Sequence, residues 1–86
     1  MRVKDLIKNK DYDYISWRIK IAEEDREKVG QDNIFFGVCR SENGKLISMD
    51  GDTYSEDEVV LSYEEWSNPE KGITNGLTVV VEGEWL

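Results

Sequence analysis

Closely spaced carboxylates are the side chains of this sequence whose types and spacing could do chemistry. Glu64 and Glu65 are adjacent, and one residue separates Glu82 from Glu84. On a strand, Glu82 and Glu84 would leave the same face about 7 Å apart. Such pairs could in principle hydrolyse sugars by acid/base catalysis, but one carboxyl must then have a raised pKa inside a cleft. A chain of 86 residues buries one modest core and offers little room for such a cleft, so glycosidase chemistry is disfavoured.

The acidic stretch from Asp50 to Glu58 invites a calcium interpretation. An EF-hand loop needs an acid or Asn at its fifth place, Gly at its sixth and Glu at its twelfth. Counted from Asp50, those places hold Tyr54, Ser55 and Leu61, so the pattern fails at all three. We therefore expect a turn leading into a strand here, and no metal site or cofactor in the chain.

Missing residue types narrow the chemistry further. The chain has no histidine, so the usual general base and the commonest neutral metal ligand are absent. A single cysteine, Cys39, excludes an intramolecular disulfide and the zinc sites built from several cysteines. Ser/His/Asp and Cys/His catalytic arrangements are equally impossible. Cys39 lies in a predicted strand and is best interpreted as a small core residue. We expect no catalytic residues and a protein that is not an enzyme.

Charge is distributed unevenly along the chain. Residues 1–41 hold 9 basic and 8 acidic side chains, whereas residues 42–86 hold 2 basic and 11 acidic ones. The net charge of -8 therefore belongs to the second half. A concentrated negative field repels nucleic acid and attracts basic partners, over a range that salt limits to about 8–10 Å. Direct binding of DNA or RNA is thus disfavoured. A solvated face that keeps a small protein soluble is the simpler explanation of the same charge.

The three tryptophans have different surroundings. Trp17 lies on the apolar face of a predicted strand and is expected in the core. Trp66 ends a predicted strand, and Trp85 follows Glu84 directly. An aromatic residue among acids could anchor a protein contact, because interaction hot spots are enriched in Trp and Tyr. Alternatively, Trp66 and Trp85 pack across the sheet and cover its ends. We favour packing for Trp85 and leave both interpretations open for Trp66.

The elements that must position these residues are mostly strands. Apolar residues spaced by three and four predict a short helix over 3–8, and strict alternation predicts a strand over 14–22. Asn43-Gly44 between apolar runs predicts a tight hairpin. The other predicted strands are 34–40, 45–49, 58–66 and 77–85, with a surface connection at 67–76. The polar segment 23–33 is either a helical turn or a solvated excursion.

These elements define the expected fold class. We predict a single domain over residues 1–86 with an α+β, mainly β fold: a small curled antiparallel five-stranded sheet, arranged as a meander, with a short N-terminal helix. The longest apolar runs, Val79–Val81 and Ile34–Phe36, are too short to span a bilayer. The segment Met1–Leu6 lacks the apolar core of a signal peptide. A cytoplasmic protein with no membrane partner is therefore expected.

Several short strings resemble a known group of proteins. Val3-Lys4-Asp5-Leu6-Ile7 and Asp11–Ile15, with the later stretches 50–54, 63–66 and 75–81, are similar to small uncharacterised proteins encoded by phages and mobile elements of Gram-positive bacteria. The polar segment 23–33 departs from the more compact members. The resemblance implies a small β-rich accessory protein and carries over no catalytic residue. Because such accessory proteins often bind host or phage proteins, it also favours an acidic inhibitor of a nucleic-acid-handling enzyme.

Together these arguments predict a non-enzymatic acidic binding module that acts on a basic protein, possible targets being restriction or CRISPR effectors whose nucleic acid it would mimic. The candidate partner-binding residues are Glu64, Glu65, Trp66, Glu82 and Glu84, with Asp50, Asp52, Glu56 and Asp57 contributing field. The expected mechanism is steric and electrostatic occlusion that weakens as salt rises. The alternative is a structural or self-associating accessory protein, in which β-prone edges at Ile34–Val38 or Val79–Val81 pair with another copy.

Overall fold

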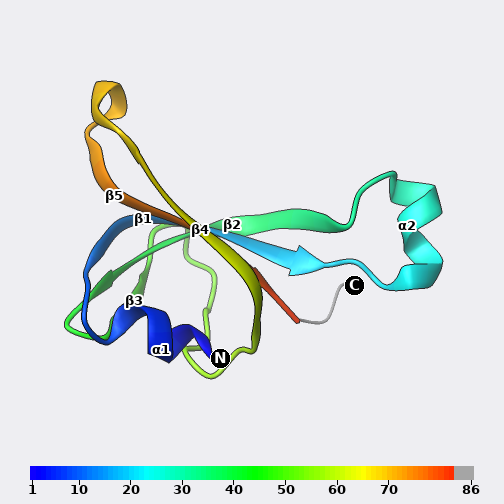
Figure 1. The fold of residues 1–86 in the computed structure, drawn as a ribbon, viewed down its shortest axis with the longest axis horizontal. Coiled ribbons are helices and arrows are strands. Elements are labelled where there is room, and N and C mark those ends of the chain that lie inside the picture. Colours follow the sequence, from blue (N-terminus) through cyan, green and yellow to red (C-terminus); the bar gives the residue numbers. More distant parts are fainter. Residues whose placement is uncertain (83–86) are drawn as a thin grey trace.

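The chain folds into one five-stranded sheet with two short helices, and the computed structural model describes residues 1–82 (Figure 1). The strands are β1 Tyr12–Lys20, β2 Asn33–Glu42, β3 Lys45–Ser48, β4 Val60–Asn68 and β5 Ile73–Val81. The helices are α1 Val3–Ile7 and α2 Glu23–Val29, and a 3-10 turn covers Pro69–Lys71. The predicted mainly β class, the five strands and the N-terminal helix are confirmed.

The order of the strands differs in one place from a meander. The sheet has the order β3-β2-β1-β5-β4, and its neighbours are antiparallel except for β1 and β5, which run parallel. The segment between β3 and β4 carries the chain from one edge of the sheet to the other. This crossing lets β5, the strand with Leu77 and Val79, lie beside the equally apolar β1 at the centre, where burial stabilises both. The sheet is therefore mixed rather than wholly antiparallel.

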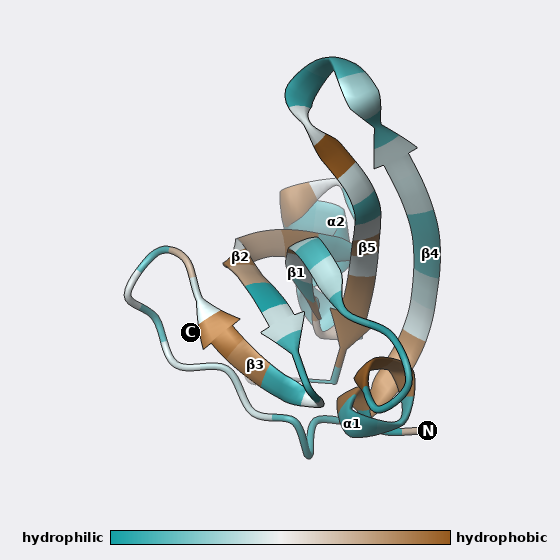
Figure 2. Ribbon diagram, turned by 90° about the vertical axis from the view of Figure 1, so that its left-hand side faces the viewer, coloured by the Kyte–Doolittle hydropathy of each residue, from teal (hydrophilic) through white to brown (hydrophobic). Residues whose placement is uncertain are grey.

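The core lies on the inner face of the sheet, which we define by the buried side chains of Ile15, Trp17, Leu77 and Val79. The opposite, outer face carries Tyr14 and Thr78, which alternate with them along β1 and β5. Figure 2 shows the sheet curled into an open trough, with α1 on its open side. The buried core residues are Val3, Ile7, Tyr12, Ile15, Trp17, Ile19, Ile21, Cys39, Leu77, Val79 and Val81. The predicted core positions of Trp17 and Cys39 are thus confirmed.

Helix α1 is too short to be stable alone and is held by what it contacts. Val3 and Ile7 are fully buried against the sheet. Two of its backbone N–H groups donate to the segment before β4, from Val3 to the carbonyl of Glu58 at 3.0 Å and from Lys4 to that of Glu56 at 2.9 Å. These bonds satisfy donors that the first turn of a helix leaves free. Helix α1 and the segment before β4 therefore form one lid over the trough.

The polar segment that the sequence left open contains helix α2. This helix ends at Gly30, and none of its residues is buried. Figure 1 shows it at the end of an arm formed by β1 and β2, away from α1. Neither helix within residues 1–82 is long and apolar enough to cross a membrane. The predicted Asn43-Gly44 hairpin is confirmed, with φ angles of 52° and 76° between the paired residues Glu42 and Lys45.

Candidate partner-binding surface

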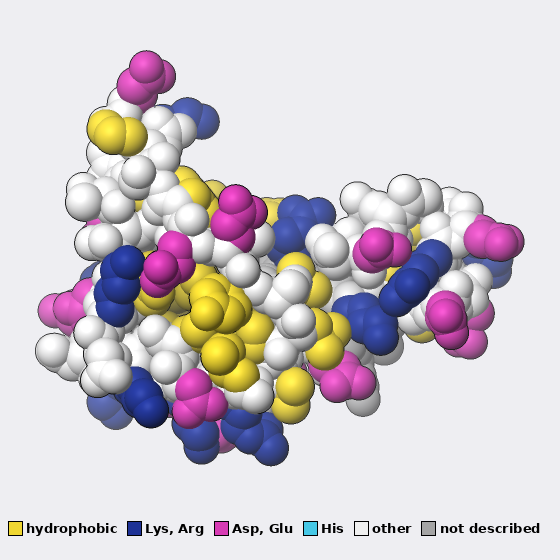
Figure 3. All heavy atoms as spheres, viewed as in Figure 1, with side chains coloured by type: hydrophobic (Ala, Val, Ile, Leu, Met, Phe, Trp, Pro, Cys, Tyr) yellow, Lys and Arg dark blue, Asp and Glu magenta, His cyan; other side chains and the backbone are white. Residues whose placement is uncertain are grey.

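The predicted partner-binding residues belong to two elements. Asp50, Asp52, Glu56 and Asp57 lie on the segment between β3 and β4, which we call the lid segment, residues 49–59. Glu64, Glu65 and Trp66 lie on β4, and Glu82 follows the end of β5. Glu84 and Trp85 lie outside the described residues. Figure 3 shows acidic side chains interspersed with basic ones on the face in view, and not gathered into one acidic surface.

Asp50 organises the lid segment. Its Oδ2 accepts hydrogen bonds from the backbone N–H of Val38 at 2.8 Å and from the Tyr54 hydroxyl at 2.6 Å. Its Oδ1 accepts from the Ser48 hydroxyl at 3.2 Å and from the backbone N–H of Asp52 at 3.1 Å. The Tyr54 bond, followed by the Val38 bond, lowers the pKa of Asp50 to about 2. Asp50 thus fastens the lid segment to β2.

Tyr54 also attaches the lid segment to β2, because its hydroxyl lies directly against Gly37. Its ring makes edge contacts with Trp17, at a centroid distance of 5.1 Å, and with Phe36, at 5.7 Å. Gly37 leaves room for this, because a Cβ there would collide with the Tyr54 hydroxyl and the Asp50 carboxylate. Burial, followed by the hydrogen bond to Asp50, raises the pKa of Tyr54 above its ordinary value. The hydroxyl therefore stays protonated and remains a donor to Asp50.

Two further acids of the lid segment also have internal partners. Oε1 of Glu56 accepts a hydrogen bond from the backbone N–H of Leu46 at 3.2 Å. Oδ1 of Asp57 forms an exposed ion pair with Nζ of Lys4 at 3.2 Å. The carboxylate of Asp52, in contrast, has no hydrogen bond or ion pair within residues 1–82. Most of the acids of the lid segment therefore connect it to its neighbours.

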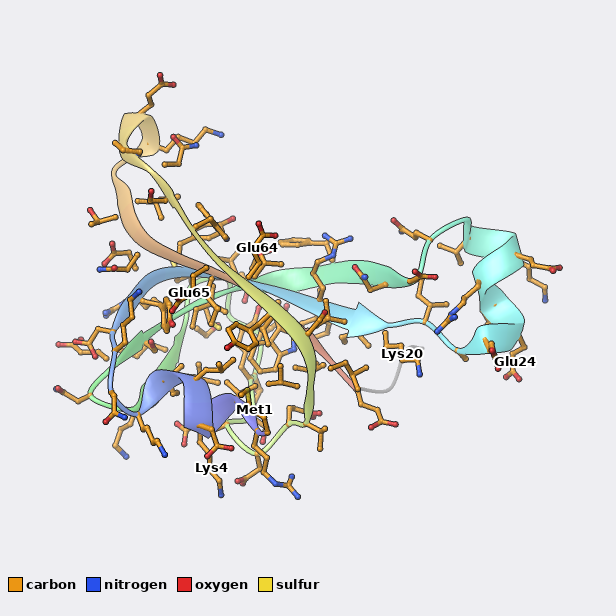
Figure 4. The ribbon with its side chains drawn as sticks, in the orientation of Figure 1. Met1, Lys4, Lys20, Glu24, Glu64 and Glu65 are labelled. Atoms are coloured by element: carbon orange, nitrogen blue, oxygen red, sulfur yellow. The ribbon has the colours of Figure 1, made fainter. Side chains whose placement is uncertain are left out.

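Glu64 and Glu65 leave opposite faces of β4 (Figure 4). Glu65 pairs with the buried Leu77 and so lies on the inner face, where it accepts hydrogen bonds from the Tyr12 hydroxyl and from Nζ of Lys10. The Tyr12 bond is the largest cause that lowers the pKa of Glu65, and Lys10 adds to it. Glu64 pairs with Thr78 on the outer face, and its carboxylate has no partner among the residues described.

Trp66 packs across the outer face. Its ring makes an edge contact with Tyr14 at 5.6 Å, and its Nε1 donates to the Thr78 hydroxyl at 3.0 Å. It lies flat enough on Gly76 that a Cβ there would come within 2.6 Å of the ring. Of the two interpretations of Trp66, the structure thus shows packing across the sheet. Glu82 is exposed, and its carboxylate has no partner within the described chain.

Sequence reasoning missed that β4 is an edge strand. It placed a free edge at Val79–Val81, which is wrong, because β5 lies between β1 and β4. On β4 itself, two exposed residues, Leu61 at 45% and Tyr63 at 48%, precede Glu64. The signal in the sequence was the Glu64-Glu65 pair in mid-strand, because charges are typical of strands at the edge of a sheet.

Two other side-chain groups bear on chemistry. Burial raises the pKa of the Cys39 thiol to about 12, so this group is a poor nucleophile. Within residues 1–82 no group of three or more acidic or cysteine side chains is placed to hold a metal ion.

No protein-family model, curated protein or solved structure matches this chain.

Proposed function

We propose that this protein is a non-enzymatic acidic binding module that acts on a basic protein partner. The observation that supports this proposal is the negative charge that remains after internal ion pairs form. In the second half of the chain, cations of the first half pair with Glu42, Asp57 and Glu65. Four exposed carboxylates there have no side-chain hydrogen bond or ion pair within residues 1–82: Asp52, Glu64, Glu70 and Glu82.

Three of these carboxylates lie on the β4–β5 hairpin or directly after it. Glu64 lies on β4, Glu70 in the 3-10 turn that joins β4 to β5, and Glu82 directly after β5. Lys71 is the only cation of the hairpin itself. Uncompensated charges of one sign speed the encounter with an oppositely charged protein and select against partners of like charge. The groove of a nucleic-acid-handling enzyme, such as a restriction or CRISPR effector, is basic, and carboxylates could occupy the positions of phosphates there.

Binding to purified restriction endonucleases and CRISPR effectors, each free and loaded with its nucleic acid, tests this proposal. The test variant is Glu64→Gln/Glu70→Gln/Glu82→Gln, and the control is Glu23→Gln/Glu24→Gln/Glu27→Gln on the exposed helix α2. Both variants remove three negative charges. We expect the hairpin variant to lose about tenfold or more in affinity at low salt, since each charge pair contributes roughly 0.5–1 kcal/mol. The control should change affinity less than twofold.

Two results would contradict the proposal. Equal losses in both variants would show that only net charge matters and that no surface of this protein is specific. Absence of binding to every basic target, free or loaded, at low salt would remove the function altogether.

Self-association is the second candidate function, and one observation favours it. On the edge of β2 that points away from β1, residues 33–37 have no strand partner within the described residues. Phe35 and Phe36 lie in this stretch, and both are more than two-fifths exposed. Unpaired strand edges with apolar side chains pair readily with other chains. Sedimentation velocity distinguishes the two candidates, because a protein that remains monomeric at high concentration is not a self-assembling component.

A further inference from the structure

The open edge of β4 is the feature that carries a further inference. The first residues of the chain cover only its beginning, where the N–H of Val60 donates to the carbonyl of Met1 at 2.9 Å and Arg2 forms a bridge with Val59. From Leu61 to Asn68, the edge of β4 that points away from β5 forms no backbone hydrogen bond within residues 1–82. Eight residues of strand extend over roughly 26 Å. Their unpaired N–H and C=O groups are a template for one more strand.

The two faces beside this edge differ in chemistry. On the outer face, the carboxylate of Glu64, which has no partner within residues 1–82, lies next to Trp66. On the inner face, Lys10 and Tyr12 already bind Glu65, and the neighbouring Tyr63 is half exposed. An added strand would thus meet, within the described residues, a carboxylate without a partner on one face, and on the other the Tyr63 ring beside a carboxylate that Lys10 and Tyr12 already bind. Because side chains alternate along a strand, its complement alternates basic and apolar residues.

We propose that the edge of β4 binds an extended protein segment in which Lys or Arg alternates with apolar residues, by adding it to the sheet as a sixth strand. This inference rests on the proposed function, since it names the part of a basic partner that is recognised. Main-chain hydrogen bonds provide the affinity in such strand addition, and alternate side chains provide the specificity.

A second copy of this chain is a poorer occupant of the same edge. The centre of the stretch Leu61–Asn68 lies between Glu64 and Glu65. Residues directly opposite each other in an antiparallel pair lie on the same face, so two copies that pair about this centre place Glu64 opposite Glu64 of the other copy, or Glu65 opposite Glu65. Like charges directly opposite each other destabilise a strand pair. The edge thus disfavours its own copy and favours a basic segment.

The test measures binding of the full-length protein to an eight-residue peptide in which Lys and Val alternate, by fluorescence anisotropy. Two further peptides carry N-methyl groups on every second residue, in the two alternate phases. Methylation leaves the charge unchanged, and in one phase it removes the N–H groups that face β4. We expect that one methylated peptide to bind at least tenfold more weakly. Glu64→Lys should weaken binding of the parent peptide at least tenfold, and the control Glu24→Lys on α2 less than twofold.

The failure of this inference is distinguishable from the failure of the proposed function. If both methylated peptides bind as tightly as the parent, strand addition is wrong, although salt-dependent binding would leave the basic-partner function intact. Strand addition is also wrong if the peptide does not bind while a basic nuclease does. If the protein alone dimerises and Glu64→Lys changes the dimer affinity, the edge belongs to a second copy and the inference is overturned.

Discussion

Asp50 on the lid segment and Glu64 on strand β4 use their carboxylates in opposite ways. Asp50 in the lid segment accepts four hydrogen bonds, whereas the carboxylate of Glu64 on β4 accepts none within the described residues. Glu56 and Asp57 likewise bind β3 and α1. Most acids of the lid segment therefore have partners within the fold, and the outward acids of the β4–β5 hairpin have none within residues 1–82.

The cause of this difference lies in the backbone around each acid. Strand β3 ends at Ser48, so the N–H of Val38 on β2 has no strand acceptor beyond it, and Asp50 provides one. The backbone at Glu64 already pairs with β5 on one side, and its side chain projects from the outer face, where it has no partner within residues 1–82. Side-chain acceptors are recruited where turns leave donors free. The number of acids in a segment consequently says little about the charge that a partner meets.

The largest effect expected on the lid segment comes from Gly37→Ala. The new Cβ collides with the Tyr54 hydroxyl and the Asp50 carboxylate, so these two side chains must move and their attachment to β2 is disturbed. Forcing extra atoms into a packed site costs about 1–3 kcal/mol, which urea unfolding followed by tryptophan fluorescence measures. In an Asp50→Ala/Tyr54→Ala background the same change should cost clearly less, because both obstacles are gone. An unchanged unfolding midpoint would show that Tyr54 does not pack on Gly37.

Local patterns predicted much of the fold. The alternation through Ile15 and Trp17 identified β1, and Asn43-Gly44 identified a hairpin, because both signals act between near neighbours. The parallel pairing of β1 with β5 was not predictable in this way. It depends on burying two apolar strands side by side, and those strands are about sixty residues apart.

The candidate site was predictable only in part. Strand alternation alone implies that Glu64 and Glu65 leave opposite faces, so this separation was present in the sequence. The role of Asp50 was not, because its main-chain partner is Val38 on a distant strand. The same holds for Glu65, whose partners Lys10 and Tyr12 come from the other end of the chain. Acids can be located from sequence, but their partners require the tertiary structure.

A smaller effect is expected from Asp50 in acid. Its folded pKa of about 2 lies below the ordinary value of 3.8, so the carboxylate stabilises the fold above about pH 4 and loses that contribution as the pH falls towards 2. We expect the free energy of unfolding to fall more steeply over this range in the unsubstituted protein than in Asp50→Asn. Urea unfolding at several pH values measures the slopes. Glu64→Gln is the matched control, and a flattened slope in that variant would contradict the contrast between the two regions.

The smallest effect is expected from the ion pair between Lys4 and Asp57. Both side chains are more than half exposed, so water screens their attraction and the pair orders two flexible side chains for little gain. A double-mutant cycle with Lys4→Met and Asp57→Asn should therefore give a coupling below about 0.5 kcal/mol. Chemical denaturation at low and at physiological salt measures it. A coupling well above about 1 kcal/mol at physiological salt would show that Asp57, like Asp50, belongs to the attachment of the lid segment. A weak coupling would instead leave its carboxylate free to exchange Lys4 for a cation of the proposed basic partner.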